Sequence, residues 1–239
     1  MKMNSKSLVV SGINFRNIRL AYIFTAIVIL AIVVQDIVMY ILGAAGVVNF
    51  YEDNSTVALG NYFFLIIIFG AIFIPSLNFR KMMNLGGKRA DFFKGCAVTY
   101  VIMAAAVSLA HMLFLYTYDR LVSALLYGGG TLDVMYVFGW MANGSVVAFF
   151  QQFAFLLLFA AVLHTLTAAQ DKWYGWAADV LIVAIISVFT PIAPLRAALV
   201  WFFNLIIFQS SAALQIAACL VLSCLIYLLN KPILARKII

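Results

Sequence analysis

Most polar residues of this chain that could do chemistry lie inside long apolar stretches. Asp36 follows the basic residue Arg19, and His111 follows Lys94, by a helical length of roughly 25 Å in each case. Gln151 and Gln152 lie deeper in another stretch. A carboxylate, an imidazole and amides at such depths are candidates to line or gate a pathway through a membrane. Two interpretations stay open: Asp36 and His111 meet in an outer gate, or they are separate interfacial residues.

The same residue types do not form a recognisable catalytic or metal site. His111 and His164 fall at opposite depths, which does not favour a Ser–His–Asp triad. The three cysteines lack metal-ligand spacing. Gly87-Lys88 does not complete a phosphate-binding GxxxxGK[ST] loop, because Met82 stands where the first glycine belongs. We therefore predict no enzyme activity, no metal and no cofactor in this chain. ATP and Mg would have to bind a separate subunit.

Composition indicates that water is not the main solvent of this chain. Apolar residues make up 67% of it and charged residues 10%, against roughly 45–50% and about 25% in soluble domains. We predict one membrane domain over 1–239. The net charge of +7 is explained by basic residues concentrated in the loops on one side of the membrane and by their attraction to anionic lipid headgroups. We do not expect nucleic acid as a partner.

Six stretches approach the roughly 20 apolar residues that a membrane-spanning helix needs. They are 20–44, 59–79, 95–118, 146–166, 176–190 and 211–229. Only helices can satisfy their own backbone over such lengths in lipid, so the predicted fold class is an all-α integral membrane protein with six transmembrane helices.

Basic residues alternate between the segments that connect these stretches. Thirteen of the fifteen fall in four segments on one predicted side, and only Arg120 and Arg196 fall on the other. The thirteen are Lys2, Lys6, Arg16, Arg19, Arg80, Lys81, Lys88, Arg89, Lys94, Lys172, Lys231, Arg236 and Lys237. Because basic loops stay on the inner side, both termini are predicted to be cytoplasmic. The opposite loop with Glu52 and Asp53 is predicted to be external.

Two segments do not fit a simple span. The segment 1–19 is too short and too polar to cross a membrane, and we expect an amphipathic surface helix there. The segment 191–210 is apolar but contains Pro191, Pro194 and Arg196, which favours a short re-entrant helical pair on the outer side. The alternative is a fifth span that is long and kinked.

The basic segment 80–94 joins the second and third stretches and is long for a simple turn. Its residue types predict a short cytoplasmic helix, a Gly-Gly break and exposed Met and Phe side chains with a cationic rim, as a protein docking surface would need. The alternative is a charged loop that binds only lipid headgroups. The candidate docking residues are Arg80, Lys81, Met83, Asn84, Leu85, Gly86, Gly87, Lys88, Arg89, Asp91 and Phe92.

This segment resembles the second intracellular segment of bacterial ABC-2-type permeases. The resemblance rests on Asn84-Leu85-Gly86, then Arg89, then Asp91-Phe92-Phe93-Lys94-Gly95, and on the predicted layout of the whole chain. The chain departs from the family pattern at Gly87 and Lys88, where an apolar residue and Ser or Thr are usual.

The resemblance implies a subunit that works with others. A separate cytoplasmic ATPase would bind ATP and Mg, and 80–90 would couple its closure to the spans. An elbow over 13–20 would also contact the ATPase. The elbow residues are Asn14, Phe15, Arg16 and Arg19, and the external gate residues are Pro191, Pro194 and Arg196. A second copy or a homologous permease would complete the membrane part.

The expected function is therefore the permease subunit of an ATP-driven exporter in a bacterial plasma membrane. The expected substrate is an amphipathic peptide, an antimicrobial or a lipid-like compound. Two alternatives remain open. One is a non-transporting immunity, sensor or assembly protein. The other is an ion-coupled secondary transporter, which would normally carry carboxylates near the middle of the membrane.

Overall fold

A computed structural model describes residues 5–47, 56–126 and 131–237, and 87% of the structure is helical. The predicted all-α class is confirmed. A two-residue parallel pair, in which Thr56 lies opposite Thr131, joins two loops and was not predicted. Lys2, Glu52 and Asp53 lie outside the described residues.

Five helices within the described residues are long and apolar enough to cross a membrane. They are α2 (Arg19–Ala44); η1 (Leu59–Phe63), α3 (Phe64–Phe73), η2 (Ile74–Asn78) and α4 (Phe79–Asn84) in sequence; α5 (Arg89–Phe114) with η3 (Leu115–Asp119) and α6 (Arg120–Leu125); α8 (Ser145–Ala169); and α11 (Ala212–Leu228) with α12 (Asn230–Arg236). The remaining elements are α1 (Ser5–Asn17), β1 (Thr56–Val57), β2 (Thr131–Leu132), α7 (Val134–Val137), η4 (Trp140–Asn143), α9 (Trp173–Phe189), α10 (Ala193–Phe203) and η5 (Asn204–Phe208).

A sixth candidate span is a bent pair. The helices Trp173–Phe189 and Ala193–Phe208 are each too short to qualify as a membrane span alone. The chain bends by 118° between them. Pro191 lies in the break, and Pro194 lies in the first turn of α10. Proline is tolerated there because the N–H that it lacks would have no hydrogen-bond partner within the helix. The bend fits both the re-entrant interpretation of 191–210 and a broken fifth span, so the re-entrant segment stays a prediction.

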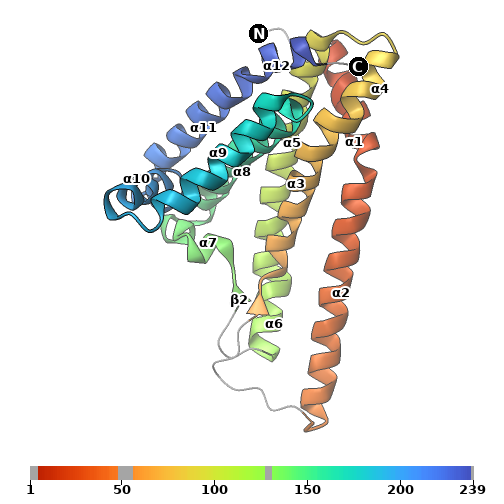
Figure 1. Ribbon diagram of the computed structural model, residues 1–239. Helices are drawn as coiled ribbons and strands as arrows, with labels where there is room; N and C mark the ends of the chain where they lie inside the picture. Colours follow the sequence, from red (N-terminus) through yellow and green to blue (C-terminus); the bar gives the residue numbers. More distant parts are fainter. Residues whose placement is uncertain (1–4, 48–55, 127–130, 238–239) are drawn as a thin grey trace.

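The connecting segments that carry the basic residues lie at one end of the molecule (Figure 1). We call this end the terminal end. The first turn of α1, the end of α12, the α4–α5 turn and the α8–α9 turn lie there, whereas β2, α6 and the last turn of α2 lie at the opposite end. The folded chain therefore brings the four basic segments to a common side. Which side of a membrane this is remains the prediction made from loop charge.

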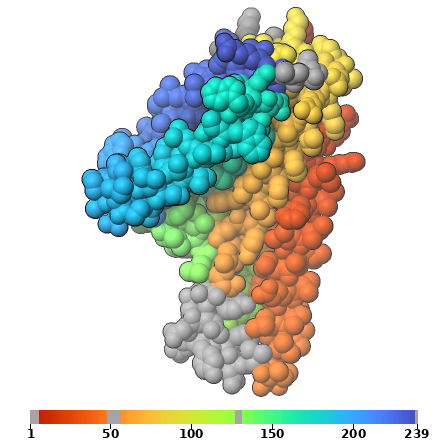
Figure 2. All heavy atoms as spheres, in the orientation of Figure 1, coloured from red at the N-terminus to blue at the C-terminus, as the bar shows by residue number. Residues whose placement is uncertain are grey.

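The packing centres on helices α5 and α8, with α1 and α3 against α5, and α3 and α11 against α8. The buried core includes Phe79, Phe92, Met103 and Leu156. In contrast, α2, α9 and α10 bury almost none of their apolar side chains, and Figure 2 shows α9 and α10 projecting from the body. Lipid or another protein chain must cover these apolar surfaces in a membrane.

Helix α1 lies within the segment 1–19, where a surface helix is expected. It packs along the start of α5, where Gly95 allows a close approach to Val10. Asn14 is fully buried, donates to the Thr99 hydroxyl over 3.2 Å and accepts from Asn78 over 3.2 Å. These polar contacts attach α1 to the bundle, while Leu8 and Val9 are exposed, and its contact with the membrane surface stays a prediction. Of the other elbow residues, Phe15 is half-buried and Arg16 and Arg19 are exposed.

Candidate functional site

The Gly-Gly sequence of the predicted coupling segment forms a tight turn between α4 and α5. Gly86 has a φ of 78°, in the left-handed region that favours glycine. The amides of Gly86 and Gly87 donate to the carbonyls of Met83 and Met82 over 3.0 and 2.9 Å, which closes the end of α4. The short helix expected before the Gly-Gly break corresponds to α4, which continues the helix Leu59–Asn84, and its coupling role stays a prediction. All residues of 80–94 are described by the structure, and they form the end of α4, a turn and the start of α5.

The side chains of this turn divide into a buried and an exposed set. The prediction that Met and Phe project as docking residues is wrong, because Met83 and Phe92 are buried. Phe92 packs edge-to-face against Phe79, with 5.3 Å between ring centroids. Leu85 is the apolar side chain that projects, with 85% of its surface exposed. The exposed polar residues of the segment are Arg80, Lys81, Asn84, Lys88 and Lys94.

Arg89 holds the C-terminal helix instead of facing a partner protein. Its guanidinium donates to the carbonyls of Leu234 and Ala235, the second over 2.7 Å. It also lies over the Phe79 ring, 5.7 Å from the centroid. Asp91 is in the first turn of α5, where a carboxylate offsets the positive end of the helix dipole. Both residues thus stabilise the base of the turn.

A second cation fixes the same end from the other side. Lys237 is buried, donates to the carbonyl of Ala168 over 3.2 Å and pairs with Asp171 at 2.8 Å. Asp171 also lies 3.8 Å from the exposed guanidinium of Arg80. The end of α12, the α8–α9 turn and α4 are thereby joined into one braced unit.

Replacing Arg89 with alanine should loosen α12 without unfolding the bundle. Hydrogen bonds from a charged donor contribute about 1.5–3 kcal/mol, and here the loss falls on the last helix alone. We expect carboxypeptidase to trim the C-terminus several times faster in Arg89→Ala. Lys88→Ala, which removes an exposed neighbouring charge, is the matched control. Equal trimming rates in the two variants would contradict the bracing role.

A buried polar network occupies the opposite end of the structure. The His111 imidazole bonds to Asp133 through Nε2 at 2.7 Å and accepts from Gln152 at Nδ1 over 2.6 Å. All three side chains are fully buried. Because the Gln152 amide is a donor to Nδ1, the neutral imidazole donates from Nε2 to Asp133. Asp133 also accepts from the Met135 amide over 2.6 Å and so caps α7.

The structure does not pair Asp36 with His111. The Tyr118 hydroxyl donates to Asp36 over 2.8 Å, and no bond between Asp36 and His111 is present in the described part of the chain. Gln151 accepts from Asn143 over 3.3 Å, so the two adjacent glutamines serve different partners. Of the two interpretations, the one in which Asp36 and His111 stay apart agrees with the structure, although both are buried in it.

Sequence reasoning missed two aspartates of this region. Asp119 accepts from the amides of Leu59 and Gly60 over 2.7 and 3.4 Å and thereby caps η1. Asp133 closes the network with His111. The preference of aspartate for the position before a helix could have identified Asp133, since Val134 begins α7. No local signal identifies Asp119, whose partners lie far away in the sequence.

The predicted gate residues Pro191, Pro194 and Arg196 are exposed at the bend between α9 and α10. Arg196 lines a cavity inside this bend together with Thr190 and Asn204. The gate role of the three residues stays a prediction.

Comparisons with protein-family models, with curated proteins and with solved structures found no match to this chain. The class of the protein therefore rests on the structure itself. It is an all-helical protein whose long apolar helices indicate a membrane location.

Proposed function

We propose that this chain is the membrane-spanning permease subunit of an ATP-driven exporter. One observation carries the proposal: an exposed turn with a projecting leucine joins two long apolar helices at the terminal end. A partner that moves this turn acts directly on two membrane-length helices, Leu59–Asn84 and Arg89–Leu125.

The turn is suited to transmit a displacement because its base is fixed. Arg89 and Lys237 tie the helix ends to α12, and Asn14 ties α1 to α5. Packed helices move as stiff bodies, since interiors are close-packed. A push on Leu85 would therefore tilt the helices rather than bend the turn.

The exposed side chains define the chemistry of the partner. Leu85 needs an apolar pocket, and Lys81 and Lys88 favour acidic groups around it. A cytoplasmic ABC ATPase subunit with ATP and Mg is the partner we propose. Arg16 and Arg19, which are exposed on the α1–α2 junction, would add contacts from the elbow. The apolar surfaces of α2, α9 and α10 would face lipid and a second permease, and the substrate would be amphipathic or hydrophobic.

The test is ATPase stimulation with defined components. Each ABC ATPase of the source organism would be purified and added to the chain in proteoliposomes. We expect one to bind and to hydrolyse ATP faster, and Leu85→Ser to weaken that binding about tenfold, as loss of an interface anchor does. Leu121→Ser, an exposed leucine on α6 at the opposite end, should leave binding unchanged.

The same experiment separates the alternatives. If none of the ATPases binds, the exporter proposal fails and a non-transporting membrane protein becomes the better assignment. If one binds equally well to Leu85→Ser, the turn is not the coupling site. An ion gradient that drives transport without any ATPase would favour the secondary transporter.

A further inference from the structure

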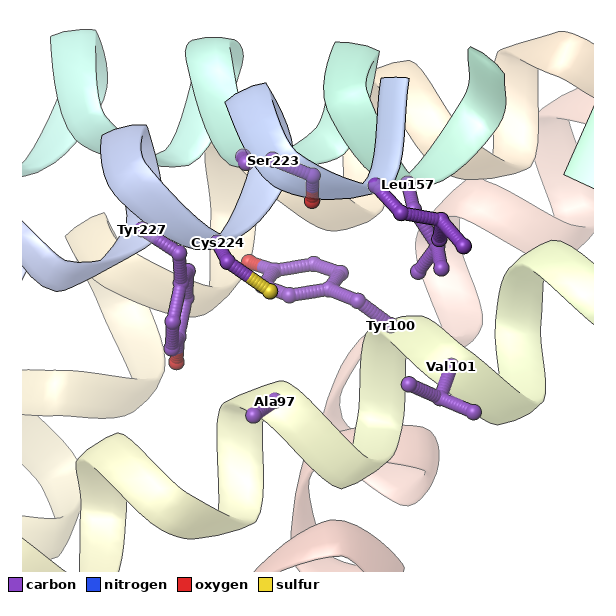
Figure 3. A pocket seen from close by; sticks show the side chains of 9 residues that line it. Ala97, Tyr100, Val101, Leu157, Ser223, Cys224 and Tyr227 are labelled. Carbon is purple, nitrogen blue, oxygen red and sulfur yellow. The ribbon is translucent and has the colours of Figure 1, made fainter. Parts of the chain in front are cut away.

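A cavity of about 150 Å³ lies between α5, α8 and α11, on the terminal-end half of these helices. Figure 3 shows Tyr100 and Val101 from α5, Leu157 from α8, and Cys224 and Tyr227 from α11 around it. An apolar cavity of about this volume in another protein holds a benzene molecule, so this one is large enough for part of a hydrocarbon chain.

The walls of the cavity are mostly apolar, and the hydroxyls of its two tyrosines are already bonded. The Tyr100 hydroxyl bonds to His164 Nδ1 at 2.6 Å, and the Tyr227 hydroxyl donates to the carbonyl of Phe93 over 2.7 Å. The tyrosines therefore offer ring surface rather than free hydroxyls. A polar ligand would find few partners here, whereas hydrocarbon would bury apolar area without displacing the bonds of the two tyrosine hydroxyls.

The cavity opens sideways, toward the surface that a membrane would contact. Cys224 is exposed at its edge, and Val101 is 47% exposed beside it. In Figure 3 the Cys224 sulfur points toward the Tyr100 ring. A chain from the surrounding lipid can enter from this side without separating the helices.

Two lysines stand one helical turn from the cavity, toward the terminal end. Lys94 precedes Ala97 by three residues on α5, and Lys231 follows Tyr227 by four on the helix Ala212–Arg236. Residues at these spacings lie on the same helix face. Arg89 bonds to Ala235, so the start of α5 and the end of α12 lie side by side, and both lysines are exposed. The terminal edge of the cavity therefore carries two positive charges on its open side.

We propose that this is a binding site for one anionic phospholipid. One acyl chain occupies the cavity lined by Tyr100, Leu157 and Cys224, and the phosphate lies between Lys94 and Lys231. The two halves of the site match the two halves of the molecule: hydrocarbon below the membrane surface and a negative headgroup at it. The site needs no ATPase, so it goes beyond the proposed function.

The test uses the purified full chain alone, delipidated in detergent and offered phosphatidylglycerol and phosphatidylcholine with identical acyl chains. Native mass spectrometry counts the lipids that stay bound. We expect one retained phosphatidylglycerol, preferred roughly 30-fold, the ratio that two lysines of about 1 kcal/mol each would give. Glycerol 3-phosphate, the headgroup chemistry without chains, should not displace it.

Two variants test the two halves of the site. Lys94→Gln with Lys231→Gln should abolish the preference for phosphatidylglycerol. Lys81→Gln with Lys88→Gln, an equal loss of exposed charge at the same end, should keep it. Cys224→Phe should fill the cavity and prevent retention of either lipid. If this variant does not fold, the lysine pair decides alone.

Three results would overturn the proposal. They are a preference that survives loss of Lys94 and Lys231, displacement by glycerol 3-phosphate, and full retention in a folded Cys224→Phe. Because no ATPase is present, failure here leaves the coupling proposal untouched, and failure of ATPase binding leaves this site untouched.

Discussion

Replacing Asp133 with alanine should destabilise the protein by about 2–6 kcal/mol, since a buried donor left without a partner costs about 1–3 kcal/mol and two are left here. His111 Nε2 loses its acceptor, and the Met135 amide loses its cap. Both groups are buried, and lipid offers no replacement. The melting temperature in detergent should fall by roughly 10 °C.

Asp133→Asn is the matched control, and its effect should be much smaller. The asparagine oxygen can keep the bond from the Met135 amide, while its NH₂ group faces His111. The imidazole can then accept at Nε2 and donate from Nδ1. Gln152 can receive that proton by turning its amide, because its oxygen has no partner in the described structure. Equal melting temperatures for Asp133→Ala and the native protein would show that this network does not stabilise the fold.

Replacing Gly95 with alanine should detach α1 from the bundle at a cost of about 3 kcal/mol, at the upper end for overpacking. The new Cβ would lie 2.3 Å from Cγ1 and 2.5 Å from Cβ of Val10. The Val10 Cβ cannot rotate away, so the whole helix must shift. The bonds of Asn14 to Thr99 and Asn78 would break with it.

Cys96 reports this change, because it is fully buried beside Asn14 in the native structure. In a Cys224→Ser background, maleimide should label Cys96 rapidly in Gly95→Ala and slowly in the parent. Gly12→Ala is the control, since a Cβ there meets nothing within 4 Å. Val10→Gly combined with Gly95→Ala should make labelling of Cys96 slow again. The glycine in α1 should still cost about 1 kcal/mol of stability. Labelling that stays slow in Gly95→Ala would contradict the packing argument.

Much of the candidate site could be located from the sequence, but not interpreted. The Gly-Gly break at 86–87 predicted a turn, and a turn is there, because positive φ strongly favours glycine. The same pattern could not show that Phe92 faces inward. Inward and outward faces of a helix in a membrane protein are both apolar, so hydropathy does not distinguish core from lipid contact.

The sequence by itself determined the helical class, the long apolar segments, the break near Pro191 and the collection of basic residues at one end. These follow from local rules: apolar length, the missing amide of proline and the charge of loops. Only the tertiary structure decided that His111 bonds Asp133 and not Asp36, that Arg89 holds α12, and that Leu85 is the side chain left exposed. Such pairings depend on which helices pack together, and that information is spread over the whole chain.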